Sequence, residues 1–204
     1  MQDSVIVLKV NNYKDRDLIV TFLSKENGRL TACARNAKGS KKRFSGGIDV
    51  LSCAKVKIGR KNNLESYSII ESWQNLSTSP KLFSLAYFCI ESILALTQDS
   101  QEEAKDFFMP LFYSLRTLNS FKTFEKQKSI AVFFAVKIIN LSGFGLPNTN
   151  SKHLDDYISA LEQANSPIFP KESKIIDQML ALTKSRIEEI SSKEIKSIDS
   201  ISLI

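Results

Sequence analysis

The spacing of apolar residues changes near residue 79, and this change constrains the fold more than any other feature. Before it, apolar residues alternate with polar ones in short runs, as at Ile6, Leu8 and Val10. Alternation in runs rich in β-branched side chains predicts strands with one buried face. After Pro80, apolar residues recur every three or four positions, which predicts amphipathic helices. We therefore expect a β-rich part followed by a helical part.

The alternating part contains five runs between Val5 and Trp73. The second and third are separated by Glu26-Asn27-Gly28, a sequence typical of a tight hairpin turn. Five short strands in about 75 residues are typical of a small closed barrel, most often of the OB type. The sequence therefore predicts an α+β fold in two domains. Residues 1–78 form a five-stranded OB-type β-barrel, and residues 79–204 form an all-α helical domain.

The helical part divides into five predicted helices. Pro110 interrupts the second of them and should either kink it or mark a new start. The third is apolar nearly all round, so we expect it to be the buried centre of a bundle. The tail, residues 193–204, fits either a docked or a free segment. The predicted helices cover residues 80–96, 102–118, 124–141, 152–164 and 171–191.

Charge is distributed unevenly between the two parts. The chain has 28 Lys and Arg against 22 Asp and Glu. Residues 1–78 hold 14 of these cations and 7 of the acids, a net charge of +7, whereas residues 79–204 have a net charge of −1. A basic first domain predicts that it meets a polyanion. The alternative is that the excess charge only keeps the protein in solution.

The third strand and the loop after it hold the densest group of cations. Alternation places Arg29 and Arg35 on one face, about 20 Å apart, a spacing that can follow a phosphate backbone. Aromatic side chains beside this track could stack bases, although each also fits core packing. The candidate base-stacking residues are Tyr13, Phe44 and Tyr67. The candidate DNA-binding residues are Arg29, Arg35, Lys38, Lys41, Lys42, Arg43, Lys55, Lys57, Arg60 and Lys61.

Signals for catalysis, metals and membranes are weak. His153 is the only histidine, and the three cysteines lie far apart. No phosphate-binding glycine loop or nucleophile elbow is present, so we expect no enzyme and no cofactor. The longest apolar run, residues 130–136, is about a third of a membrane span, and no signal peptide is recognisable. We therefore expect a cytoplasmic protein.

Several strings, in this order, resemble the bacterial recombination mediator RecO family. They are VIVLK at residues 5–9, YKDRDLIVT at 13–21, GRL at 28–30, ARNAKGSKKRF at 34–44, LAY at 85–87 and LSGFG at 141–145. The resemblance covers roughly residues 4–150, and the segment ending at Phe44 is its most specific part.

The resemblance implies an OB domain on a helical domain, without catalytic turnover and associated with the nucleoid. It implies binding of single- and double-stranded DNA and annealing of complementary strands. It also implies action with RecR, sometimes with RecF, to load RecA onto DNA coated by single-strand binding protein (SSB). The family's basic OB surface corresponds to Arg29, Arg35, Lys38, Lys41, Lys42 and Arg43.

Two family features fit this sequence less well. Many members carry four zinc-binding cysteines after the LSGFG position, but residues 143–204 contain no cysteine, so zinc is not expected. The family's helical domain also receives the acidic SSB tail in an apolar groove flanked by cations, for which Lys128 and Lys137 are the candidates here. Two other functions stay open: a general single-strand DNA- or RNA-binding OB protein, and an adaptor whose helical domain is the working surface.

Overall fold

The computed structural model describes residues 1–40, 43–44, 47–170 and 172–199. The chain forms two compact units. The first unit is Met1–Gln74 with Thr97–Phe112, and the second is Asn75–Leu96 with Tyr113–Ile204. The first unit thus includes residues 97–112, which the change of periodicity alone assigns to the helical part.

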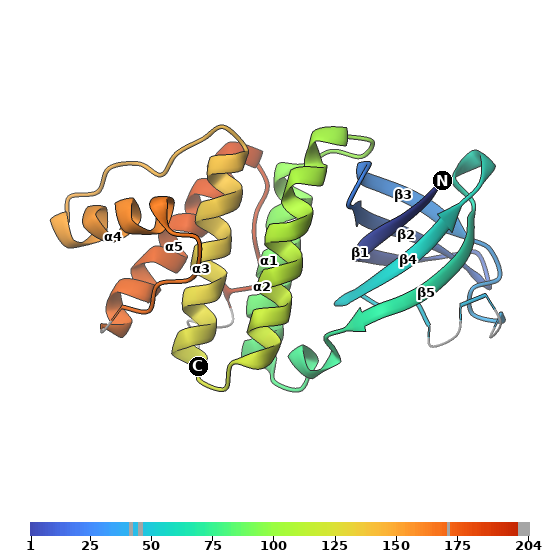
Figure 1. Cartoon of the computed structure of the whole chain (residues 1–204), viewed down its shortest axis with the longest axis horizontal. Helices are drawn as coiled ribbons and strands as arrows, with labels where there is room; N and C mark the ends of the chain where they lie inside the picture. The colour runs from blue at the N-terminus through green and yellow to red at the C-terminus, as the bar shows by residue number, and fades with distance from the viewer. Residues whose placement is uncertain (41–42, 45–46, 171, 200–204) are drawn as a thin grey trace. The chain divides into compact units, whose positions relative to one another are not determined.

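The first unit is built on one antiparallel sheet, with strand order β3-β2-β1-β4-β5 (Figure 1). This confirms the predicted α+β architecture with an OB-type N-terminal sheet. The strands are β1 (Gln2–Tyr13), β2 (Asp17–Ser24), β3 (Gly28–Ala34), β4 (Ser52–Ile58) and β5 (Leu64–Ser72).

The sheet curls around an apolar core but does not close by a full ladder. Alternate residues of all five strands fill this core, among them Val5, Phe22 and Val56. Within the described residues, β3 meets the chain before β5 at one isolated parallel bridge, Cys33 with Asn63. The residues just before Asn63 form a turn with positive φ rather than a strand, so pairing stops at that bridge.

Residues 97–101 run along β3 and are bonded to it. The Ser100 amide donates to the Arg29 carbonyl (2.8 Å), and the Arg29 amide donates to the Gln101 carbonyl (3.2 Å). Gly28 has φ +68°, and a Cβ there would collide with the Gln101 carbonyl. Only glycine therefore satisfies both the hairpin turn and this close approach.

The expected helix over residues 102–118 is split in two. A 3-10 helix, η3 (Glu102–Phe107), lies against β2 and β3 and buries Ala104 and Phe107. It is followed by α2 (Phe108–Ser120), whose first turn contains Pro110. Proline is tolerated there because first-turn amides have no intrahelical acceptor, so Pro110 marks a new start rather than a kink.

The second unit is a bundle centred on α3 (Phe124–Leu141), as its apolar circumference predicts. Helix α3 packs against three helices (Figure 1). These are α1 (Pro80–Leu96), α4 (Lys152–Gln163) and α5 (Ser173–Ser191). In the described part of the chain, no helix combines the length and the apolarity that a bilayer span requires.

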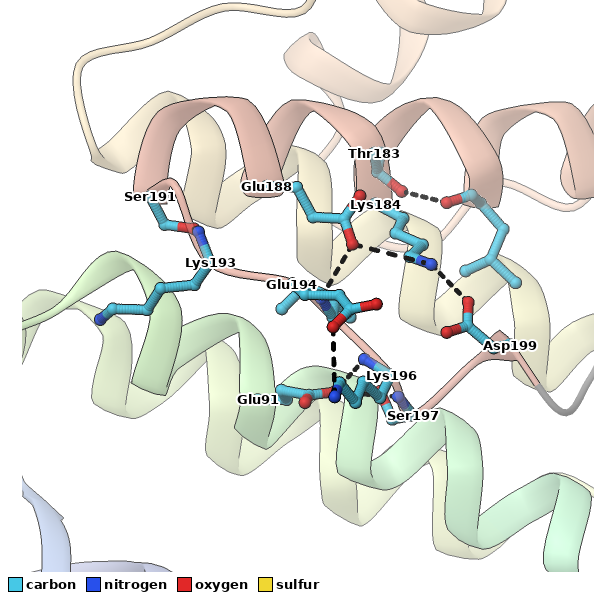
Figure 2. A network of polar contacts seen from close by, with 12 residues as sticks. Glu91, Thr183, Lys184, Glu188, Ser191, Lys193, Glu194, Lys196, Ser197 and Asp199 are labelled. Carbon is cyan, nitrogen blue, oxygen red and sulfur yellow. Dashed lines mark hydrogen bonds and ion pairs between the residues drawn. The ribbon is translucent and has the colours of Figure 1, made fainter.

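Residues 193–199 form an irregular segment that ends in a turn and is docked on the bundle (Figure 2). Ile195 and Ile198 are buried. Glu188 of α5 accepts a hydrogen bond from the Ile195 amide (2.8 Å). Glu91 of α1 accepts hydrogen bonds from the backbone amides of Lys196 (3.1 Å) and Ser197 (3.0 Å). The sequence left open whether the tail is docked or free, and the structure shows that it is docked as far as residue 199.

A buried carboxylate ties the β2–β3 turn to the start of β1. Asp3 is 6% exposed. Its Oδ2 accepts hydrogen bonds from the Ser24 hydroxyl, the Asn27 side-chain amide (2.9 Å) and the Glu26 backbone amide (3.3 Å). One side chain thus holds several donors that would otherwise be unsatisfied next to the core.

We predict that Asp3→Ala lowers the free energy of unfolding of the first unit by about 2 kcal/mol, because it leaves buried donors without an acceptor. Urea unfolding followed by the fluorescence of Trp73 measures this, since Trp73 is the only tryptophan and is fully buried. Asp15→Ala, at the exposed β1–β2 turn, is the matched control. Equal unfolding midpoints for the two variants would contradict the assignment.

Candidate nucleic-acid interface

The loop after β3 lies next to the turn between β1 and β2. The Lys38 amide donates to the Arg16 carbonyl (3.3 Å), and the Asn36 amide donates to Asp17 Oδ1 (2.7 Å). Arg16 and Lys38 are both exposed. The β1–β2 turn therefore adds Lys14 and Arg16 to the cations predicted from the sequence. The signal that would have found them is that the β1–β2 loop is a usual ligand loop of OB folds.

Arg35 and Arg43 lie close together at the end of β3. Arg43 Nη2 donates to the Arg35 carbonyl (2.9 Å), and the Arg43 guanidinium lies 5.2 Å from the centre of the Phe44 ring. The Arg43 carbonyl accepts from the Tyr67 amide of β5 (3.3 Å), which holds this part of the loop against the sheet. Among the described acids, none forms an ion pair with Arg35, Lys38 or Arg43, so their charges face solvent.

The cations of β4 and of the turn after it are also exposed. Lys55 and Lys57 point away from the core, because they alternate with the buried Ala54 and Val56. Lys57 forms an ion pair with Glu65 (3.0 Å), which reduces its net charge, whereas Lys55 has no such pair among the described residues. Arg60 and Lys61 belong to the 3-10 turn η1 (Arg60–Asn62), which lies beside β3.

Arg29 is a structural residue rather than part of the phosphate track. Its Nη1 donates to the Thr97 carbonyl (2.6 Å), and the neighbouring Thr31 hydroxyl donates to Asp99 (2.9 Å). Burial lowers the pKa of Arg29, and the charge of Asp99 opposes this shift. The structure therefore does not show Arg29 and Arg35 on one exposed track: Arg29 is partly buried beside residues 97–101, whereas Arg35 is exposed.

Two of the three candidate stacking aromatics are buried. Phe44 is 3% exposed and Tyr67 is 5% exposed, and both pack in the apolar core of the sheet. Their predicted role in base stacking is therefore wrong. Tyr13 is 46% exposed, and the Lys14 ammonium lies 5.4 Å from its ring centre, so its ring is accessible at the β1–β2 turn. Lys41 and Lys42 lie outside the described residues.

The exposed cations thus gather on three loops of an OB-type sheet. The model described as "Recombination protein O N terminal" matches residues 1–76. A DNA repair protein RecO from Caldanaerobacter subterraneus subsp. tengcongensis is 26% identical over 148 residues, which is 71% of this chain and 58% of the relative. The chain is therefore similar to RecO proteins, and the family model matches its first 76 residues.

Two further proteins named DNA repair protein RecO match the chain similarly. The protein from Syntrophus aciditrophicus is 29% identical over 143 residues, which is 68% of this chain and 54% of the relative. The protein from Desulfatibacillum aliphaticivorans is 28% identical over 148 residues, which is 69% of this chain and 55% of the relative. The chain spans slightly more than half the length of these curated RecO relatives.

The two cations proposed to receive the SSB tail do not share a site. Lys128 is 5% exposed and bonded to Asp177 (2.6 Å) and Glu125 (3.0 Å). Burial opposes the charged ammonium, but these two carboxylates outweigh it and raise the pKa of Lys128. Lys137 lies nine positions along α3, which is half a turn away at 100° per residue, and it donates to the Glu162 carbonyl (2.9 Å). The structure therefore places the two lysines on opposite faces of α3.

The second unit does contain a groove of about 700 Å³, lined by α1, α3, α5 and the docked tail segment. Phe124 lines it between two cations, with Lys81 Nζ at 5.7 Å and Lys128 Nζ at 5.5 Å from the ring centre. At the other end, Lys184 bonds to Asp199 and lies 3.7 Å from Glu188 (Figure 2). Four carboxylates and three lysines line the groove, and Lys81 is the lysine among them that forms no ion pair with a described residue.

Metal-ligating side chains are scattered in the part of the chain that the structure describes. No group of three or more His, Cys, Asp or Glu side chains there is placed to hold a metal ion. His153 is exposed on α4. Burial raises the pKa of Cys53 to about 11, with the charge of Glu71 acting in the same direction, so this thiol is protonated near neutral pH.

We predict that Tyr67 makes the first unit sensitive to alkaline pH. Burial raises the pKa of Tyr67 to about 12, and its hydrogen bond with Ser52 (2.8 Å) partly opposes the shift. An unfolded tyrosine loses its proton near pH 10, so stability should fall by up to about 2 kcal/mol as the pH rises from 10 to 12.

Urea unfolding at pH 9 and pH 11.5, followed by Trp73 fluorescence, tests this prediction in wild type and in Tyr67→Phe. The variant should lose less stability between the two pH values than the wild type does. Tyr13→Phe, which changes an exposed tyrosine, should behave like wild type. An equal loss in all three proteins would refute the assignment to Tyr67.

Proposed function

We propose that this chain is a member of the RecO family that acts in DNA repair and recombination by binding DNA through its OB unit, without catalytic turnover. The observation that supports this most is the set of exposed cations on the β1–β2 turn, the β3–β4 loop, strand β4 and the β4–β5 turn that form no ion pair with a described residue. The members with described positions are Lys14, Arg16, Arg35, Lys38, Arg43, Lys55, Arg60 and Lys61. In OB folds these loops are a common place for nucleic-acid binding.

The chemistry of this surface suits binding without sequence preference. Lysine and arginine contact phosphates, which carry no sequence information, and binding gains free energy by releasing condensed counterions. Tyr13 adds one exposed ring on which a base can stack. The surface can thus bind single-stranded DNA of any sequence through phosphates and one stacked base. It can bind duplex DNA through phosphates alone.

Strand annealing is the step that this surface would promote. Two complementary strands repel each other through their phosphates, and a cationic surface that binds both reduces this repulsion. Because the contacts are electrostatic, they hold any pair of sequences while base pairing selects the correct partner. Contacts to phosphates do not occupy the base edges, so they leave the two strands free to pair.

Partners belong to the same proposal. The family resemblance suggests RecR, with RecF in some members, as partners in loading RecA onto DNA coated by SSB. For the acidic SSB tail, the groove of the second unit offers Lys81 and Phe124. Two rival functions, a general single-strand DNA- or RNA-binding protein and an adaptor without DNA affinity, are tested by comparing affinities for single-stranded DNA, duplex DNA and RNA at one salt concentration.

We predict that replacing Arg35, Lys38 and Arg43 together by Gln weakens single-strand binding and slows annealing. Three lost phosphate contacts should make the slope of log affinity against log salt shallower by about 2, following about 0.7 per phosphate. Fluorescence anisotropy of a labelled oligonucleotide over a salt series gives the slope. Quenching of a dye pair on complementary strands gives the annealing rate.

The matched control is Lys25→Gln. Lys25 follows β2 at the end away from the β1–β2 turn, roughly 25 Å along the strand by its rise per residue. Removing this charge should leave both the salt slope and the annealing rate near wild type. If the triple variant anneals as fast as Lys25→Gln, the loop after β3 is not the DNA site.

We predict that a synthetic SSB-tail peptide binds the groove of the second unit, with its carboxylates near Lys81 and an apolar end near Phe124. Isothermal titration with the full chain measures the affinity. Lys81→Gln should weaken binding several-fold, about 1 kcal/mol for one charge-assisted contact. Lys152→Gln, an exposed lysine at the start of α4, is the control. Equal affinities for both variants would exclude this groove as the peptide site.

A further inference from the structure

A second cavity, of about 620 Å³, lies in the first unit between the start of β3, the β4–β5 turn and residues 100–102. This volume is typical of sites for small organic ligands and too small for a duplex. It lies beside the cationic β4–β5 turn, because η1 supplies part of its wall. None of the DNA contacts proposed so far uses its interior.

The cavity wall combines three kinds of side chain. Leu30 and Ile58 supply apolar surface continuous with the core of the sheet. Asn62 supplies an amide from the turn, and Arg60 supplies a guanidinium. An apolar surface, an amide that can donate and accept, and a cation together match the base, the base edge and the phosphate of one nucleotide.

The charge balance of the cavity favours an anion. Arg60 is exposed and forms no ion pair among the described residues. Arg29 also lines the cavity, although its Nη1 is occupied by the carbonyl of Thr97. The one acid in the wall, Glu102, is paired with Lys105 (3.4 Å), which reduces its repulsion of a phosphate.

The turn that carries Arg60 and Asn62 is held in an unusual conformation. Lys61 has φ +55° and Asn62 has φ +52°, a left-handed region that side chains other than glycine and asparagine rarely adopt. Consecutive residues of this kind cost free energy and occur most often where a structure positions ligand groups. Here the turn places Arg60 and Asn62 in the wall of the same cavity.

We propose that this cavity receives one nucleotide of a bound single strand, with the base against Leu30 and Ile58, its edge at Asn62 and its phosphate at Arg60. This inference rests on the proposed function, and it adds a base-holding site to a surface otherwise made for phosphates. A nucleotide held in the cavity anchors the strand and limits its sliding along the cationic loops.

The test compares two strands of equal length, an oligothymidylate and an abasic deoxyribose-phosphate strand, by anisotropy with the full chain. Asn62→Gly removes the amide while glycine tolerates the positive φ. It should weaken oligothymidylate binding by about fivefold, the effect of one hydrogen bond, and leave abasic binding unchanged. Leu30→Phe, which adds volume to the cavity wall, should have the same selective effect, and its binding of the abasic strand shows that it is folded.

The two cations of the turn form a matched pair. Arg60→Gln should weaken binding of both strands and make the salt slope shallower by about 0.7, because one phosphate contact is lost. The Lys61 side chain does not line the cavity, so Lys61→Gln should weaken binding of both strands less than Arg60→Gln does.

Three results would overturn the proposal. If the wild-type protein binds the abasic strand as tightly as oligothymidylate, the base contributes nothing to binding and the cavity does not hold it. Asn62→Gly and Leu30→Phe that weaken both strands equally would show a general change of the loop. In either case DNA binding itself, and so the proposed function, would stand. Wild type that binds neither strand would overturn the proposed function together with this site.

Discussion

The contact between β3 and residues 97–101 decides which part of the sheet faces solvent. The contact depends on Gly28, where a Cβ would collide with the Gln101 carbonyl, and on two backbone hydrogen bonds. It also includes the hydrogen bond from the Arg29 guanidinium to the Thr97 carbonyl. The Arg29 guanidinium is partly buried, and its hydrogen bond to Thr97 helps to hold this contact. The other described cations of the unit are exposed on strands and turns, among them Arg35 at the far end of β3 and Lys55 on β4.

The local pattern of the sequence predicted the elements well because their formation depends on near neighbours. Alternation at Ile6, Leu8 and Val10 and helical spacing after Pro80 both reflect which face of an element is buried, which a single segment already encodes. Pro110 was equally readable, since its missing amide allows only a first-turn position or a break. The same reasoning identified Arg35, Lys38 and Arg43, because loop cations without neighbouring acids tend to remain in solvent.

The parts that the sequence did not predict depend on contacts between distant residues. Arg29 and Thr97 are 68 positions apart, and no local pattern relates them. Lys128 and Asp177 are 49 positions apart, so a lysine that resembled a free surface cation is in fact a buried partner of two acids. Tyr67 was assigned to a surface role because tyrosine suits both environments, and only its hydrogen bond with Ser52 across the β4–β5 pair shows which one applies.

The conformation of the cationic loops connects the fold with DNA binding. All three loops contain side chains with positive φ, at Lys14, Asn36 and the pair Lys61 and Asn62. Each such residue costs about 1 kcal/mol or more, so the surrounding contacts must hold it in place. For Asn36 that contact is Asp17, which accepts a hydrogen bond from its backbone amide and joins the β1–β2 turn to the β3–β4 loop. Cations on loops fixed in this way lose little conformational freedom on binding, so more of the free energy of counterion release remains as affinity. A flexible basic tail of the same charge would bind more weakly and hold two strands less closely, so the folded sheet, and not the net charge alone, supports the proposed strand annealing.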